Sequence, residues 1–162
     1  TNSAAGAIPR LIDMGVEAFL IVSTAKTIIA QRLVRRLTAI KEEYRLSDGE
    51  YASLARVVDM DRLLGFLRDE GLIAKKATWK DVVFFKPKPN DESEDGFKGR
   101  IGIHEILPVT STIKEIILRG GTPDEIEAQA KKEGMMTMLE DGIFQAAQGK
   151  TTIEEVLRVV SE

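Results

Sequence analysis

The last third of the chain reads as a series of short helices, and its start and stop signals limit the fold more than any other feature. Thr122 is followed by a proline and, three residues after the threonine, by Glu125, which is the pattern of a capping box. Thr151 and Glu154 repeat that spacing. Three glycines mark the ends of successive helices: Gly120, Gly134 and Gly149. The sequence therefore predicts three or four short helices from Thr110 onward.

Two more helices are expected at the beginning of the chain, in "TNSAAGAIPRLIDMG" and "EAFLIVSTAK". Asn2 or Ser3 can cap the first helix and Gly15 can end it, provided that Pro9 falls within the first turn or two. The second stretch is apolar enough to predict a buried helix. The next stretch, "TIIAQRLVRRL", is ambiguous between helix and strand, but the alternation in its last part favours a strand.

The middle of the chain combines helices with short strands. Ser47 and Glu50 form a capping box before leucines at helical spacing, and Gly71 ends that region. "DVVFF", residues 81–85, is rich in residues typical of strands, and "GRIGIHEIL", residues 99–107, fits as its antiparallel partner. "KPKPNDESEDG" between them is a loop by composition. The resulting fold class is α/β with a helical C-terminal tail.

Composition excludes several classes of protein. The chain has 23 basic and 26 acidic residues, a formal net charge of −3, which argues against a general binder of nucleic acid or anionic membranes. It has no cysteine, so it has neither a disulfide framework nor a thiolate zinc site. No apolar run approaches the roughly 18 to 20 residues of a membrane helix, and we expect a cytoplasmic protein. The chain opens on Thr1 without a methionine, so we expect a fragment.

Two features resemble catalytic motifs. Gly149-Lys150-Thr151 resembles the end of a phosphate-binding loop, but six residues instead of four separate Gly149 from Gly142, and a helix precedes it where a strand is required. A helix-ending glycine followed by a capping threonine explains all three residues. His104, the one histidine, has no cysteine, second histidine or serine in a usable pattern, so we interpret it as a structural residue of a strand.

Three arginines in "QRLVRRL" are the remaining candidates, for a contact with phosphate, with a neighbouring subunit or with water alone. In a strand, Arg32 and Arg36 share one face with Val34, whereas Arg35 lies on the other, more apolar face. A buried Arg35 must therefore find a partner. From the residues alone the chain shows no recognisable active site.

Three stretches together resemble a known family: "TNSAAGAIPRLIDMGVEAFLIVSTAKTIIAQRLVRRL", "GFKGRIGIHEILPVTSTIKEIILRG" and "EGMMTMLEDGIFQAAQGKTTIEEVLRVV". They are similar to the C-terminal part of the secretion traffic ATPases, the hexameric motors of type II secretion and type IV pilus assembly (the GspE and PilB family). The resemblance implies the C-terminal portion of a RecA-like nucleotide-binding domain at 1–37, a small mixed insertion with a short antiparallel sheet at 38–98, and a strand with a helical tail at 99–162.

The resemblance also implies where the site residues lie. Thr1 and Asn2 would follow the histidine of the family's His box, and the phosphate-binding loop and catalytic acids would lie upstream of them. We therefore expect no catalytic residue, metal or bound cofactor in this chain, with ATP and magnesium bound by the full-length parent. Arg32 and Arg36, with Thr1 and Asn2, are expected at the edge of the nucleotide site or at a subunit contact.

The implied partners are other copies of the parent in a hexamer and an inner-membrane platform protein. The implied location is cytoplasmic, at the inner face of the cell membrane. Two alternatives remain: a non-catalytic adaptor that binds a protein through its helical tail, and a nucleic-acid motor, which the acidic balance disfavours.

One departure from the family concerns zinc. Many of these ATPases carry two cysteine pairs, which would fall at Thr38 and Lys41 and at about Pro89 and Glu92 of this chain, where no thiolate is present. We interpret residues 38–89 as a metal-free replacement of the zinc subdomain. Six apolar residues are expected to pack in place of the metal, at about 1.5–3 kcal/mol for each fully buried side chain: Leu54, Val58, Leu63, Leu64, Phe66 and Leu67.

Overall fold

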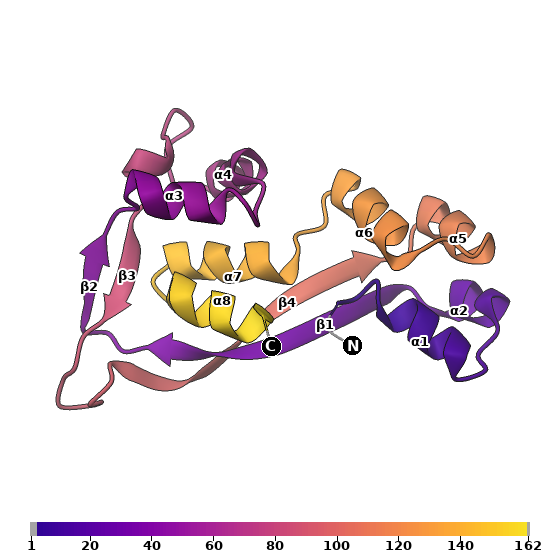
Figure 1. Ribbon diagram of the computed structural model, residues 1–162, viewed down its shortest axis with the longest axis horizontal. Coiled ribbons are helices and arrows are strands. Elements are labelled where there is room, and N and C mark those ends of the chain that lie inside the picture. Colours follow the sequence, from indigo (N-terminus) through magenta and orange to yellow (C-terminus); the bar gives the residue numbers. More distant parts are fainter. Residues whose placement is uncertain (1–2, 162) are drawn as a thin grey trace. The chain divides into compact units, whose positions relative to one another are not determined.

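The computed structural model describes residues 3–161, which form a mixed α/β protein (Figure 1). The chain divides into two compact units, each built from two separate stretches of sequence. The described residues up to Gln31, with His104–Met138, form the first unit, and Arg32–Ile103, with the described residues from Leu139 onward, form the second. None of the described helices has both the length and the apolar character that crossing a membrane requires.

The first unit contains α1 (Ala7–Asp13), α2 (Ala18–Thr24), α5 (Ser111–Leu118) and α6 (Pro123–Lys132). Short helices of this kind are stabilised by burying an apolar face together. Their buried core consists of Ala4, Ala5, Ile8, Val22, Leu107, Val109, Ile113, Ile116, Ile117, Ile126, Ala130 and Met135.

Both N-terminal helices differ from the sequence expectation. Asn2 lies outside the described residues, and Ser3 does not cap α1; its hydroxyl accepts the N–H of Gly6 at 3.1 Å, in the turn before the helix. The helix starts at Ala7, which places Pro9 in its first turn, where a missing N–H costs no helical hydrogen bond. The second helix, α2, is not fully buried, because the side chain of Phe19 is 65% exposed.

Four strands form two two-stranded sheets within the described range. The predicted strand is β1 (Thr27–Leu37), and it pairs with β4 (Phe97–Pro108), which runs in the opposite direction (Figure 1). A short antiparallel sheet joins β2 (Lys41–Tyr44) to β3 (Phe84–Pro87), with Tyr44 opposite Phe84. The expected pairing of "DVVFF" with "GRIGIHEIL" is therefore wrong.

Aromatic packing explains why β3 pairs with β2. Phe84 is fully buried; its ring lies 6.2 Å from that of Tyr44 and stacks on that of Trp79 at 6.4 Å. Such cross-strand aromatic contacts stabilise one pairing over another. Trp79 begins the 3-10 helix η1 (Trp79–Asp81), and its indole N–H donates to the carbonyl of Met60 at 3.1 Å.

The second unit contains α3 (Asp48–Leu54), α4 (Met60–Asp69), α8 (Ile153–Ser161) and all but the first residue of α7 (Met138–Ala147). Five of the six apolar residues expected to pack here are buried, and Phe66 is partly exposed beneath the guanidinium of Arg62. Arg62 also ties α4 to α7, since its Nη1 lies 2.8 Å from both carboxylate oxygens of Glu140. Gly142 of α7 lets Val156 of α8 approach closely.

The helix caps were largely predictable. Two of the three expected capping boxes are confirmed, Ser47 with Glu50 and Thr122 with Glu125. The third is displaced by one residue: α8 is capped by Thr152, whose hydroxyl accepts the N–H of Glu155 at 3.1 Å. Thr151 is instead buried against β1.

Candidate functional site

The arginines of β1 lie in the second unit. The faces of the strand on which their side chains lie differ from the expectation. Val34 is buried and Leu33 is exposed, so the face shared by Arg32 and Val34 is the inward one. The alternation then breaks, because Arg35 and Arg36 are both exposed and Leu37 is buried. At this end the backbone of β1 bonds to the chain between α7 and α8: the Leu37 N–H donates to the Lys150 carbonyl at 2.9 Å. This pairing with a second segment accompanies the loss of the two-residue alternation of buried and exposed side chains that a regular strand shows.

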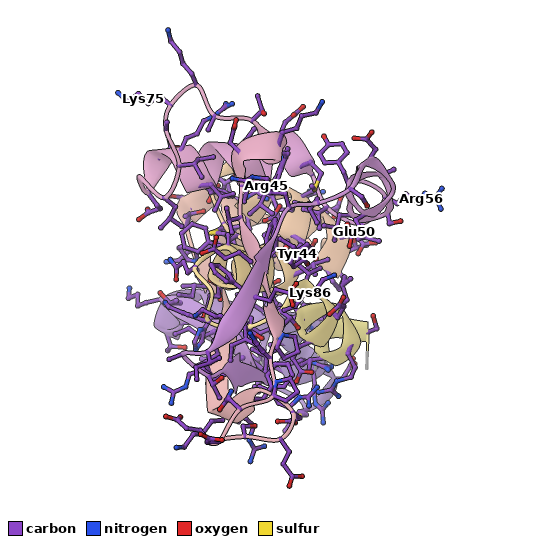
Figure 2. The ribbon with its side chains drawn as sticks, turned by 90° about the vertical axis from the view of Figure 1, so that its left-hand side faces the viewer. Tyr44, Arg45, Glu50, Arg56, Lys75 and Lys86 are labelled. Carbon is purple, nitrogen blue, oxygen red and sulfur yellow. The ribbon has the colours of Figure 1, made fainter. Side chains whose placement is uncertain are left out.

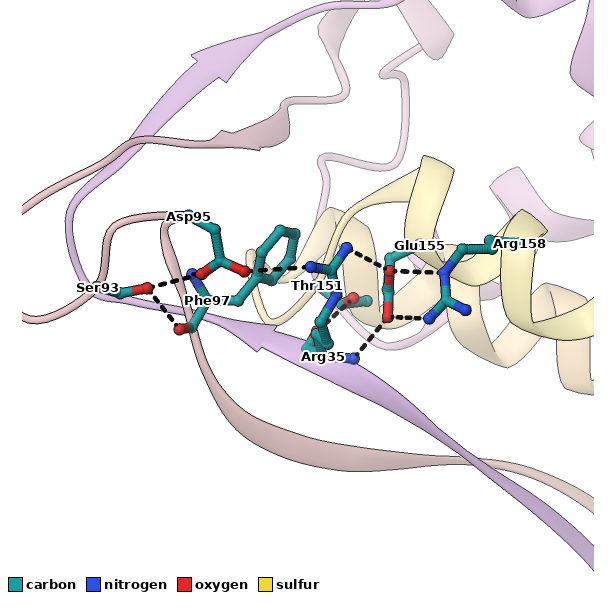
Figure 3. Close-up of polar contacts among 7 residues, drawn as sticks. All are labelled: Arg35, Ser93, Asp95, Phe97, Thr151, Glu155 and Arg158. Atoms are coloured by element: carbon teal, nitrogen blue, oxygen red, sulfur yellow. Dashed lines mark hydrogen bonds and ion pairs between the residues drawn. The ribbon is translucent and has the colours of Figure 1, made fainter.

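Arg35 is exposed and not buried as expected, but it still has an acidic partner. Its Nη2 lies 2.9 Å from Oε2 of Glu155, and its backbone N–H donates to Oε1 of the same carboxylate at 3.1 Å (Figure 3). Arg158, one turn further along α8, donates to Oε1 at 2.8 Å and to Oε2 at 3.2 Å. A carboxylate that is 3% exposed is thus held between two guanidinium groups, the geometry in which charge-assisted hydrogen bonds are strongest.

The other side of Arg35 contacts the turn before β4. Nη1 of Arg35 lies 3.2 Å from Oδ2 of Asp95, and its guanidinium lies 4.1 Å from the centre of the Phe97 ring (Figure 3). Oδ1 of Asp95 accepts the Ser93 hydroxyl at 2.7 Å and the Phe97 N–H at 3.0 Å. The hydrogen bond from the Ser93 hydroxyl lowers the pKa of Asp95 most, followed by that from the Phe97 N–H. The positive charge of Arg35 lowers this pKa further. Arg35 therefore joins α8 to the strand pair.

The remaining predicted residues lie near the same cluster or outside the described range. Arg32 donates from Nη1 to the carbonyl of Val159, near the end of α8, where a cation complements the helix dipole. Arg36 donates from Nε to the carbonyl of Lys98 at 3.3 Å. Thr1 and Asn2 lie outside the described residues.

The electrostatics of the cluster follow from its geometry. Burial acts to raise the pKa of Glu155, but hydrogen bonds from the side chains of Arg158 and Arg35 and from the Arg35 N–H outweigh it and lower the pKa to about 2. The hydrogen bond between the side chains of Arg35 and Glu155 also raises the pKa of Arg35. Because the pKa of Glu155 is lower in the folded than in the unfolded state, its ionised carboxylate stabilises the fold at pH values above the unfolded pKa. This stabilisation is lost as the pH falls toward the folded pKa.

This pH dependence can be tested with one substitution. In the wild-type protein Glu155 should contribute less to the free energy of unfolding as the pH drops from about 4.5 to 3, by about 2 kcal/mol at 1.36 kcal/mol per pH unit. Glu155→Gln should lack this component. The measurement is urea unfolding at both pH values, with Glu154→Gln at the exposed neighbouring position as the matched control. An equal pH dependence in Glu155→Gln and wild type would contradict the assignment.

Gly149-Lys150-Thr151 does not form a phosphate-binding loop. Gly149 has a φ of 74° just after α7, as expected of a residue that ends a helix. Thr151 is fully buried, and its hydroxyl donates to the carbonyl of Arg35 at 2.8 Å. The segment lies between two helices, so it lacks the strand that precedes a phosphate loop.

Sequence reasoning missed Glu105, the residue after His104 in β4. Glu105 is 3% exposed, and its carboxylate accepts the N–H of Ala4 at 2.7 Å and the N–H of Met138 at 3.3 Å, all within the first unit. A glutamate among the apolar residues of a strand is the signal that could have identified it, because a buried charge needs fixed donors. His104 itself is partly exposed, and no group of three or more metal-ligating side chains lies together among residues 3–161.

Comparison with known proteins shows similarity along the whole chain. Residues 1–158 match the family model described as type II/IV secretion system protein. The chain is 39% identical, over its full length, to a type II secretion system protein E of Xanthomonas campestris, and 37% identical to a type IV pilus assembly ATPase PilB of Pseudomonas aeruginosa. A type II secretion system ATPase E of Vibrio cholerae is 35% identical to it. The chain covers 26%, 26% and 28% of these relatives, about a quarter of their length.

Proposed function

The chain belongs to the type II/IV secretion system protein family, and from this membership we propose that it is the C-terminal part of a hexameric ATP-driven motor for type IV pilus assembly or type II secretion. The family match over residues 1–158 carries the proposal. The parent protein would have a RecA-like nucleotide-binding domain, lie in the cytoplasm at the inner membrane and act on a platform protein there.

ATP and magnesium are proposed for the parent and not for the described residues of this chain. The Gly149-Lys150-Thr151 segment does not fit a triphosphate, because the Thr151 hydroxyl is committed to the Arg35 carbonyl and the segment follows a helix. We therefore assign no step of ATP hydrolysis to these residues.

Residues 38–98 are proposed as a metal-free replacement of the family's zinc subdomain. The two places where the cysteine pairs would fall are joined by a hydrogen bond, since Nδ2 of Asn90 donates to Oγ1 of Thr38 at 2.9 Å. The Thr38 N–H also donates to the carbonyl of Gly96 at 3.0 Å. Direct polar contacts thus close the base of the subdomain, and the buried leucines of α4 fill it.

The proposal is tested by comparing this chain with its parent. We expect the full-length parent to hydrolyse ATP and to form a particle of six subunits, and the 162-residue chain alone to show no hydrolysis, because phosphoryl transfer depends on a phosphate loop and catalytic acids. The measurements are ATPase rate and particle mass. A parent without ATPase activity would contradict the motor proposal, and hydrolysis by the chain alone would contradict our placement of the catalytic residues.

Arg36 offers a second test, at the predicted edge of the nucleotide site or subunit contact. It is exposed and donates a 3.3 Å hydrogen bond to the Lys98 carbonyl, so Arg36→Ala should leave the melting temperature nearly unchanged. In the parent we expect it to lower ATP turnover or the fraction of hexamer by about tenfold, the scale of one charge-assisted contact. Arg56→Ala, at another exposed arginine, is the control. Unchanged turnover and assembly in Arg36→Ala would remove Arg36 from the site.

A further inference from the structure

An apolar groove of about 470 Å³ lies on the second unit, between β2, α3 and α8. Its walls include Leu54 and Val57 on one side and Ile153 and Leu157 on the other. Val57 is 60% exposed, an unusual state for a valine that lies among other apolar side chains. Ile153 and Leu157 lie four residues apart on α8 and give their wall a helical ridge, of the kind between which the side chains of another helix fit, whereas Leu54 ends α3 and Val57 lies in the turn after it.

The two charged residues that line this groove, Glu50 and Glu154, are both acidic. Glu50 is fixed at the start of α3, where its carboxylate accepts the N–H of Ser47 at 2.8 Å and the Ser47 hydroxyl at 2.7 Å. The hydrogen bond from the Ser47 N–H, followed by that from the Ser47 hydroxyl, lowers the pKa of Glu50. The Glu50 carboxylate therefore stays ionised at neutral pH. Glu154 is exposed at the opposite wall, and its side chain has no hydrogen bond or ion pair to any residue in the range 3–161.

Tyr44 is partly buried and interacts electrostatically with both glutamates. Its ring lines the groove near Glu50, and Figure 2 shows both on one face together with Lys86. Burial, followed by the charges of Glu154 and Glu50, raises the pKa of Tyr44 to about 12. Nζ of Lys86 lies 4.7 Å from the centre of the Tyr44 ring and its charge acts on Glu50, but Lys86 does not line the groove. The groove therefore combines an apolar floor with an excess of negative charge.

We propose that this groove binds a short amphipathic helix of a partner protein, one that carries Lys or Arg beside its apolar stripe. The ridge of α8 favours a helix as occupant, and the carboxylates of Glu50 and Glu154 complement its cations. The same carboxylates repel nucleic acid and anionic lipid. The proposal goes beyond the motor function and does not depend on ATP hydrolysis.

Three synthetic peptides of about 14 residues, long enough for a marginal helix, test the occupant. The first carries leucines at helical spacing flanked by lysines, the second replaces the lysines with glutamates, and the third replaces the leucines with serines. Titration into the 162-residue chain, followed by fluorescence anisotropy, should give a Kd of about 10 µM for the first peptide alone. Tight binding of the glutamate peptide, or no binding of the lysine peptide, would overturn the proposal.

Variants of the protein then locate the binding site. We expect Glu154→Lys and Val57→Ser each to weaken binding of the lysine peptide about tenfold, through repulsion and lost apolar contact respectively. Matched controls lie on α5 in the first unit, where Glu115 and Leu118 are equally exposed. Glu115→Lys and Leu118→Ser should leave the affinity unchanged, and circular dichroism verifies that all four variants fold.

Two results would reassign the groove. Equal loss of affinity in the control variants would show that the peptide binds elsewhere. Sedimentation that reveals a dimer of the chain, abolished by Val57→Ser, would assign the groove to a second copy and overturn the peptide proposal.

Discussion

Arg62→Ala should destabilise the protein by about 3–5 kcal/mol, the largest effect expected of any substitution at an ion pair in the described residues. Arg62 is 18% exposed and Glu140 only 3% exposed, and one guanidinium nitrogen of Arg62 contacts both carboxylate oxygens at 2.8 Å. Removing Arg62 leaves the Glu140 carboxylate buried without this cation. It also uncovers the Phe66 ring, over which the guanidinium lies at 4.9 Å. Urea unfolding at neutral pH measures the loss.

Two further variants separate the ion pair from a general effect of losing an arginine. Arg56→Ala, at an exposed position near the end of α3, should change stability by less than about 0.5 kcal/mol. The double variant Arg62→Met, Glu140→Leu should recover most of the stability, because replacing both members of a buried pair by apolar residues is often neutral. If the double variant is as unstable as Arg62→Ala alone, packing and not charge explains the loss.

Gly142→Ala should also be destabilising, by about 1–3 kcal/mol, although alanine favours helices over glycine. A Cβ at position 142 would lie 2.3 Å from Cγ1 and 3.0 Å from Cγ2 of Val156 on the adjoining helix. Both helices have to separate to admit the methyl group, so the overpacking exceeds the gain in helix propensity. Differential scanning calorimetry measures the fall in melting temperature.

Gly65 of α4 provides a control of opposite sign. A Cβ at this position meets nothing within 4 Å, so Gly65→Ala should stabilise the protein by about 0.5–1 kcal/mol. Combining Gly142→Ala with Val156→Ala should restore part of the loss, since the shorter side chain vacates the space. A Gly142→Ala variant as stable as wild type would show that α7 and α8 separate at no cost.

Local features of the fold were predictable because their causes lie within a few residues. The capping boxes at Ser47 and Thr122 satisfy helix N–H groups from three residues away, so the sequence displays the complete interaction. The burial of the α4 leucines follows from their helical spacing in the same way. The cap of α8 was displaced by one residue, since two adjacent threonines offer the same hydroxyl and only the contact with β1 distinguishes them.

Strand pairing was not predictable, because it depends on residues that are distant in sequence. "DVVFF" and "GRIGIHEIL" are close along the chain, but Phe84 gains more from the aromatic rings of Tyr44 and Trp79 than proximity alone offers. The prediction of which face of β1 is buried was wrong for a related reason. Counting apolar residues on each side favoured the face of Leu33, whereas the burial of Val34 is set by segments more than a hundred residues later.

In the candidate site, too, contacts between residues far apart in the sequence could not be predicted. Arg35 was predicted to be buried and therefore to need a partner; it is exposed, with a side chain that is 45% accessible, yet it pairs with the buried carboxylate of Glu155. The identity of this partner was not predicted, because Glu155 lies 120 residues away and looks like any other acid in the first turn of a helix. The contacts of Arg32 and Arg36 with nucleotide or another subunit remain predictions.

The order in which the ribosome makes this chain has a consequence for its quality control. The second unit needs α7 and α8 to complete it, and these follow its strands and the helices α3 and α4 in the sequence, so the ribosome makes them later. Until then Arg35 lacks Glu155, Arg62 lacks Glu140, and apolar side chains stay exposed to chaperones and proteases. A product truncated before residue 150 lacks Glu155 and the rest of α8, so the loss of the Arg35 ion pair with Glu155 and the uncovered apolar side chains should make it a better substrate for proteases than the complete unit.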